Sequence, residues 1–180
     1  MNPIVHGELS WLLGQSLRER RDRVLVTVAG LAPDLDGLTL LGGEALYGRY
    51  HHVLFHGYVG ALLTAAVLGS LARDRWRVVA LALVAFHLHL LCDLAGSGPG
   101  WPIFYFWPTS RTEWFWDGQW DLASRQNALI GLVVTLASLG CALRWERTPV
   151  ELFSPRWDRE VVNTVRAWFG LPATGAPPPL

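Results

Sequence analysis

The sequence predicts an all-α helical bundle that is embedded in a membrane and carries one long aromatic loop. Apolar residues make up 51% of the 180 residues and charged residues only 17%, below the roughly 25% that is usual in soluble domains. Three stretches without charge or proline are rich in Leu, Ala and Val, which favours helix over strand. They are residues 57–72, 78–92 and 126–143. The arginines lie mostly in clusters between the apolar stretches.

A weaker pair of helices is expected before these stretches, over residues 8–17 and 20–32. Each long apolar stretch is at or below the roughly 20 residues that a helix needs to cross a bilayer. The stretches are therefore short membrane spans or the buried helices of a soluble bundle, and the sequence leaves both open. We expect a single helical metal-binding domain over residues 1–170, followed by a Pro-rich, disordered tail over residues 171–180.

The arginine clusters indicate how the helices are arranged. They lie at residues 18–23, 73–77 and 144–147. If successive helices run antiparallel, all three clusters lie at one end of the bundle and the histidines and aspartates at the other. A straight helix from His6 to Asp34 would separate these residues by roughly 40 Å, so a hairpin near the first cluster is needed to bring them together. The positive-inside rule then places the arginine end in the cytoplasm and the His/Asp end at the outer face.

Residues 95–125 interrupt the helical pattern with glycine, proline and many aromatic residues. A connection of this length in a compact domain is usually a functional lid or a binding loop. Trp and Tyr also favour membrane interfaces. We therefore expect the segment from Trp101 to Trp120 to form a lid or a lipid-facing wall. Its acidic residues Glu113, Asp117 and Asp121 are either additional ligands or solvated loop residues.

The charge balance and the cysteines exclude several classes of function. Fifteen acidic and fifteen basic residues cancel, so no nucleic-acid partner is expected. Cys92 and Cys141 lie in apolar stretches and form no CxxC pair, which argues against a disulfide framework and a thiolate zinc site.

The histidines point to a metal site. All six lie in the first half of the chain, at positions 6, 51, 52, 56, 87 and 89. His89 and Asp93 are four residues apart on a predicted helix, so both side chains project from one face and can share a metal, whereas His87 lies on another face. An isolated carboxylate in an apolar helix is costly, so Asp93 needs a cation or strong donors nearby. The alternative for His89 is a buried, hydrogen-bonded histidine.

Two further motifs add metal ligands. Asp34 and Asp36 follow Pro33 in one turn, where they either cap a helix or hold one metal or bridge two. His51, His52 and His56 lie within six residues, directly before an apolar helix. Packing rarely explains such a concentration of imidazoles, so we interpret it as a metal-binding segment.

Together these motifs resemble the bacterial inner-membrane metal-dependent hydrolases, an uncharacterised family described as LexA-binding. The family pattern is an early Thr-His, a Leu-Pro-Asp-x-Asp turn, a His-Arg-x-x-Thr-His-Ser segment, and a His-x-x-x-Asp helix followed by a Gly/Pro-rich stretch ending in Trp-Pro. The matching elements are Val5-His6, the turn at residues 32–36, the segment at residues 51–57, and His89 to Asp93 followed by Trp101-Pro102 or Trp107-Pro108. The resemblance covers roughly residues 1–145.

The resemblance implies ligand roles for seven residues: His6, Asp34, Asp36, His51, His56, His89 and Asp93. His52 stands at the family's arginine position, as a substitute donor or a further ligand, and Phe55 and Gly57 replace its Thr and Ser. Loss of that arginine weakens the case for an anionic substrate held there. The family is in turn distantly similar to the all-helical zinc phospholipases C and single-strand zinc nucleases.

The function expected from the sequence is metal-dependent hydrolysis at the bacterial inner membrane. One to three divalent ions, zinc by the donor set, would polarise a phosphoester and acidify a water, with Asp34 or Asp36 as the catalytic general base. The expected partners are membrane lipid and a small-molecule or lipid-linked substrate. The alternatives are a non-catalytic membrane protein with a structural metal and a soluble helical metalloenzyme.

Overall fold

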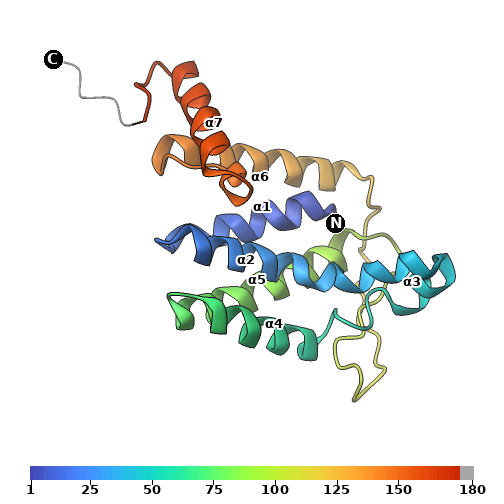
Figure 1. The fold of residues 1–180 in the computed structure, drawn as a ribbon. Helices are drawn as coiled ribbons and strands as arrows, with labels where there is room; N and C mark the ends of the chain where they lie inside the picture. The colour runs from blue at the N-terminus through green and yellow to red at the C-terminus, as the bar shows by residue number, and fades with distance from the viewer. Residues whose placement is uncertain (175–180) are drawn as a thin grey trace. The chain divides into compact units, whose positions relative to one another are not determined.

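A computed structural model of the protein describes residues 1–174. This part of the chain contains seven α-helices and three short 3-10 helices and no β-strand, which confirms the all-α prediction (Figure 1). The α-helices are α1 (Pro3–Leu13), α2 (Arg20–Leu31), α3 (Glu44–Tyr50), α4 (Tyr58–Leu71), α5 (Arg75–Gly96), α6 (Arg125–Arg144) and α7 (Pro155–Trp168). The 3-10 helices are η1 (Gly14–Ser16), η2 (Ala32–Gly42) and η3 (Pro149–Leu152).

Contacts within the chain divide it into two compact units, Met1–Gly131 and Leu132–Leu180, with the boundary inside α6. The single domain expected over residues 1–170 stays a prediction. The start of the expected disordered tail, residues 171–174, is hydrogen-bonded to α7, where the amide of Thr174 donates to Asn163 Oδ1 at 2.9 Å. The rest of that tail, residues 175–180, lies outside the described residues.

Four helices of the first unit, α1, α2, α5 and α4, lie side by side (Figure 1). Small residues allow close packing between them. A Cβ atom at Gly30 of α2 would lie 1.7 Å from Ser10 Oγ of α1, so only glycine fits there. The buried side chains of Val26, Val78 and Ala85 fill the space between α2 and α5.

The arginine-rich end of this unit is held together by Asp22. Its carboxylate accepts the backbone N–H groups of Arg73 and Asp74, each at 2.9 Å, and Arg73 also pairs with Glu19 at 2.9 Å. The α1–α2 and α4–α5 connections therefore lie together, as predicted for the first two arginine clusters. The third cluster belongs to the second unit.

Three helical segments are long and apolar enough to cross a membrane. They are Arg20–Gly42, which joins α2 and η2, Arg75–Gly96 and Arg125–Arg144. Two of the predicted apolar stretches, 78–92 and 126–143, thus belong to segments of spanning length. The third stretch, 57–72, forms the helix Tyr58–Leu71, which is apolar but shorter than these segments. The first segment reaches spanning length only because η2 continues α2 without a break.

The helix predicted over residues 8–17 begins earlier in the structure. Asn2 caps α1 by accepting the amide of Ile4 at 2.8 Å, and Pro3 occupies the first turn, a position that suits its fixed φ. His6 therefore lies on the helix rather than ahead of it. The helix ends at Leu13 and continues as η1.

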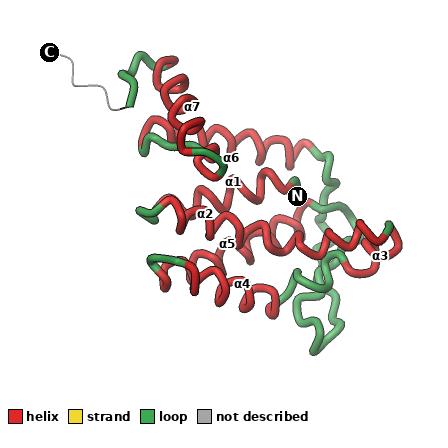
Figure 2. The backbone as a smooth tube through the Cα atoms, in the orientation of Figure 1, coloured by secondary structure: helices red, strands yellow, loops and turns green. Residues whose placement is uncertain are grey.

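The predicted aromatic loop runs from α5 to α6 and folds back onto the segment before α4 (Figure 2). The amide of Phe104 donates to the carbonyl of His52 at 3.1 Å, and the amide of Tyr58 donates to the carbonyl of Tyr105 at 3.0 Å. A Cβ atom at Gly57 would lie 2.6 Å from that Tyr105 oxygen. Glycine at this position is therefore required by the close approach of the loop.

Candidate metal centre

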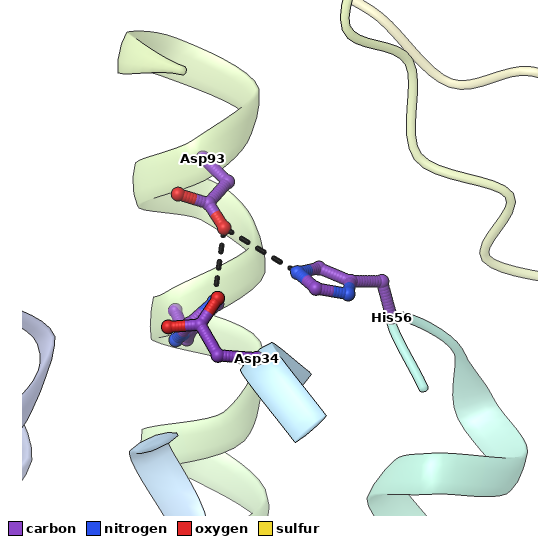
Figure 3. A group of neighbouring side chains, drawn as sticks. Asp34, His56 and Asp93 are labelled. Atoms are coloured by element: carbon purple, nitrogen blue, oxygen red, sulfur yellow. Dashed lines mark ion pairs between the residues drawn. The ribbon is translucent and has the colours of Figure 1, made fainter. Parts of the chain in front are cut away.

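The eight predicted site residues come together at the end of the first unit opposite Asp22. Four elements supply them: α1, η2, the connection between α3 and α4, and α5. The residues are His6, Asp34, Asp36, His51, His52, His56, His89 and Asp93. Figure 3 shows Asp34, His56 and Asp93 turned toward one another from three of these elements.

Asp93 is the centre of the network and is buried. Its Oδ1 atom lies 3.1 Å from His6 Nε2, and its Oδ2 atom lies 2.9 Å from His89 Nε2. Oδ1 also accepts the hydroxyl of Ser97 at 2.9 Å and forms an ion pair with the amino group of Met1. The sequence expectation that Asp93 needs nearby partners is confirmed.

His89 is held in one orientation by the backbone. Its Nδ1 atom lies 2.7 Å from the carbonyl oxygen of Gly30, which can only accept, so Nδ1 carries the hydrogen. Nε2 faces Asp93 and Asp34 Oδ1, which lies 3.5 Å away, and in a neutral His89 it is this nitrogen that offers a lone pair to a metal. Backbone carbonyls commonly fix metal-ligating histidines in this way.

Asp36 plays a corresponding role for two other histidines. It is buried and contacts His51 Nδ1 at 2.8 Å and His56 Nδ1 at 2.9 Å, and it accepts the amide of Phe55 at 3.2 Å. His56 Nε2 is thereby directed to Asp93 Oδ2, at 3.5 Å (Figure 3). Asp36 thus orients imidazoles, as carboxylates do behind zinc-bound histidines.

The donor atoms fit a divalent metal. One atom each from Asp34, His56, His89 and Asp93 lies within 4.8 Å of the others. Among residues 1–174, the buried atoms His56 Nε2, His89 Nε2 and Asp34 Oδ2 have no hydrogen-bond partner. Unpartnered buried polar atoms are costly, and a cation would satisfy all three. Two imidazoles and two carboxylates form a donor set that suits zinc.

A second group of donors lies beside the first. Asp36, His51 and His56 also place one ligand atom each within 4.8 Å of one another. His56 belongs to both groups, with Nδ1 facing Asp36 and Nε2 facing Asp93. This group offers ligand atoms for a second ion, and its hydrogen bonds orient the histidines of the first group.

Burial favours the neutral form of two further histidines. Burial, followed by the repulsion of His56, lowers the pKa of His52 to about 3. Burial also lowers the pKa of His6. At His56 burial acts in the same direction, but the neighbouring carboxylates of Asp36 and Asp93 outweigh it and raise the pKa. Neutral imidazoles are the form in which histidine binds metals.

His52 adopts an unusual backbone conformation. Its φ angle is +66°, in the left-handed region that non-glycine residues seldom occupy. The hydrogen bond from Phe104 holds its carbonyl, and its Nε2 lies 3.8 Å from Asp93 Oδ2. Its Nδ1 is buried and has no hydrogen-bond partner among the described residues. The conformation directs the ring toward the site.

A cavity of about 600 Å³ opens onto the centre. Asp34, Asp93, His51 and His52 supply its polar wall, whereas Asp36 does not line it. The remaining lining residues are Met1, Pro3, Leu31, Gly37, Tyr47, Ser97, Trp101 and Leu122. The Trp101 ring lies 5.6 Å from the His52 ring, so the start of the aromatic loop forms a wall of this cavity.

Some polar residues lie elsewhere. His87 contacts the Leu83 carbonyl at 2.8 Å and the Tyr105 hydroxyl at 2.9 Å, on a different face of α5 as expected. The loop acids Glu113, Asp117 and Asp121 are exposed and belong to neither donor group.

Sequence reasoning missed three contributors. Gln119 is buried and donates to the carbonyls of Asp93 at 3.3 Å and Trp101 at 3.2 Å, which ties the loop to the site. Ser97 follows Asp93 by one helical turn, and this spacing could have predicted their hydrogen bond. The Gly30 carbonyl was not predictable, because any backbone oxygen can serve in that role.

Comparison with known proteins identifies one family. The family model described as YdjM inner membrane protein matches residues 1–161, which include every residue of the metal centre. No curated protein and no solved structure matches the chain.

Proposed function

Because the chain belongs to the YdjM inner membrane protein family, we propose that it is a metal-dependent hydrolase of the inner membrane that acts on a phosphoester or lipid-linked substrate. The observation that carries this proposal is the convergence of unpartnered His56 Nε2, His89 Nε2 and Asp34 Oδ2 beside a cavity of about 600 Å³. A metal site that is only structural does not require a cavity beside its ligands.

Asp34, His56, His89 and Asp93 are the residues that would hold the metal. When bound, a divalent ion such as zinc polarises a phosphoryl group and makes water acidic enough to act as a nucleophile near neutral pH. His6 and the Asp36 group supply the donors for a second or third ion. The ligand types are those of the zinc phospholipases C and single-strand zinc nucleases, to which the motifs bear a distant similarity.

Asp34 and Asp36 have different roles in this proposal. Asp34 lines the cavity, and a carboxylate that ligates a metal through one oxygen keeps the other to accept a proton from a water there. Asp36 uses both oxygens on histidines and lies outside the cavity lining, so it is a positioning residue. His52 presents a neutral ring to the same cavity and can donate one hydrogen bond to a substrate.

The depth of the site supports a lipid-linked substrate. Asp93 follows Arg75 by 18 residues on α5 (93 minus 75), which corresponds to about 27 Å along the helix. The hydrocarbon core of a bilayer is about 30 Å thick. The site therefore lies near the membrane surface opposite the arginine end. By the positive-inside rule this is the outer surface, where lipid headgroups are within reach.

The test is a substrate screen on protein purified in detergent and loaded with zinc or manganese. We expect turnover of a phosphodiester or phospholipid, its loss after chelation, and its return when the metal is restored. A metal-loaded protein that turns over nothing in a broad phosphoester and lipid screen would contradict the proposal. The metal would then be structural, a role that the burial of His56 and Asp93 favours. Metal spectroscopy separates the two cases, because a structural ion carries no water.

A further inference from the structure

A second cavity, of about 260 Å³, lies outside the metal centre and is basic. It is lined by Arg49, Tyr50, Val53, Phe104, Trp107 and Arg111. Both arginines are exposed, and neither forms an ion pair with a carboxylate in the part of the chain that the structure describes. The Arg49 guanidinium lies 5.4 Å from the Tyr50 ring centre. The cavity thus offers two uncompensated positive charges and aromatic walls.

A third cavity, of about 270 Å³, is apolar and is bordered by the same loop segment, residues 103–107. Its lining residues are His87, Leu90, Leu91, Leu94, Ile103, Tyr105, Phe106 and Trp114. No carboxylate or arginine lines this space, and both ring nitrogens of His87 already have partners. Consecutive residues of the segment 103–107 line the two cavities: Ile103 and Tyr105 face the apolar one, and Phe104 and Trp107 face the basic one.

We propose that these two cavities together form a binding site for an anionic phospholipid. The headgroup phosphate lies between Arg49 and Arg111, and an acyl chain occupies the apolar cavity beside Leu90 and Leu91. Guanidinium groups bind phosphate through paired, charge-assisted hydrogen bonds. A site for free phosphate has no use for an adjacent apolar cavity, whereas a lipid requires both.

The position of the site agrees with this ligand. The tryptophans and tyrosine around it favour the membrane interface, where rings are buried and headgroups are near. Leu91 is 62% exposed on α5, a helix of spanning length, so an acyl chain can reach it from the bilayer. The inference goes beyond the proposed hydrolase activity and does not depend on it, because no metal ligand lines either cavity.

The test measures binding to the full chain in a neutral maltoside detergent. The probes are dihexanoyl phosphatidylglycerol below its micelle concentration, inorganic phosphate, and dihexanoylglycerol, which lacks the phosphate. Calorimetric titration compares the wild type with the double variant Arg49→Gln/Arg111→Gln. Arg77→Gln is the matched control, because it removes the same charge from the exposed, opposite end of the first unit.

We expect the phospholipid to bind the wild type and the Arg77→Gln control equally and to bind the double variant about tenfold or more weakly, since each contact to a charged group contributes to affinity. Leu91→Asn should weaken phospholipid binding and leave phosphate binding unchanged. Equal affinity for phospholipid and inorganic phosphate would overturn the lipid assignment. Undiminished binding by the double variant would overturn the site. Circular dichroism verifies that each variant is folded, and the single Arg111→Gln variant repeats the test if the double variant is not.

Discussion

His89 donates its Nδ1 hydrogen to the carbonyl oxygen of Gly30 at 2.7 Å. This bond joins α5 to α2 and decides which nitrogen of His89 is available to a ligand. Gly30 is also the residue at which α1 and α2 approach most tightly, because a side chain there would collide with Ser10. The same residue therefore sets helix packing and the orientation of a candidate metal ligand.

We predict that His89→Ala and Asp93→Ala each remove most of the bound metal. Both residues belong to the group of four donors within 4.8 Å. Elemental analysis of detergent-purified protein measures the effect. His87→Ala is the control on the same helix, since His87 faces Tyr105 and should leave metal content unchanged. Full occupancy in both site variants would exclude the shared centre.

Asp34→Asn and Asp36→Asn should have different effects. Asp34 faces the cavity, and the amide oxygen of asparagine can still ligate a metal, so this variant should lower kcat for a phosphoester by about a hundredfold or more, a larger factor than its effect on metal affinity. Asp36 orients His51 and His56, so its variant should lower metal affinity by roughly 10-fold to 100-fold. Steady-state kinetics and metal titration on each variant separate the two outcomes. Identical profiles for the two variants would contradict the division of roles.

Gly57→Ala should destabilise the protein and displace the aromatic loop. The new Cβ atom would lie 2.6 Å from the Tyr105 carbonyl oxygen, which the loop backbone cannot easily relieve. We expect a loss of about 1–3 kcal/mol, measured as a lower Tm in detergent. Gly48→Ala is the matched control, because no atom lies within 4 Å of its Cβ position and alanine favours helix α3. Its Tm should stay the same or rise.

The protein should pellet with membranes and resist extraction by alkaline carbonate. Three apolar segments of spanning length and the inner-membrane family support this expectation. Immunoblotting of the pellet and the supernatant measures the partition. Release of the folded chain into the carbonate supernatant would favour the soluble bundle instead.

The sequence was a good guide to which polar side chains converge, because imidazoles and carboxylates are chemically distinctive. Imidazoles and carboxylates in apolar surroundings need one another, so the convergence of His6, the His51 segment and Asp93 could be predicted without a structure. The different orientations of Asp34 and Asp36 could not be predicted. The two residues lie in one turn, and their roles depend on which side of η2 meets the histidines.

Two helices were missed for different reasons. The start of the amphipathic helix α7 can be recognised in the sequence, with Ser154 as the cap and Pro155 in the first turn. The helix contains charged residues throughout, however, so it does not appear as an apolar stretch. Helix α3 is only seven residues long and has no buried residue, so no periodic pattern marks it. The Arg49 and Arg111 cavity depends on residues that are far apart in the chain, which sequence spacing does not reveal.

The Asp22 carboxylate has a consequence at the opposite surface of the bilayer. By holding the amides of Arg73 and Asp74, it fixes how far α5 is displaced along its axis relative to α2. Asp34 follows the end of α2, and Asp93 lies near the end of α5. A slip of one residue between the helices would shift these carboxylates by about 1.5 Å relative to each other, which is enough to spoil metal coordination. Asp22 at one end of the bundle thus keeps Asp34 and Asp93 at the same level at the other end.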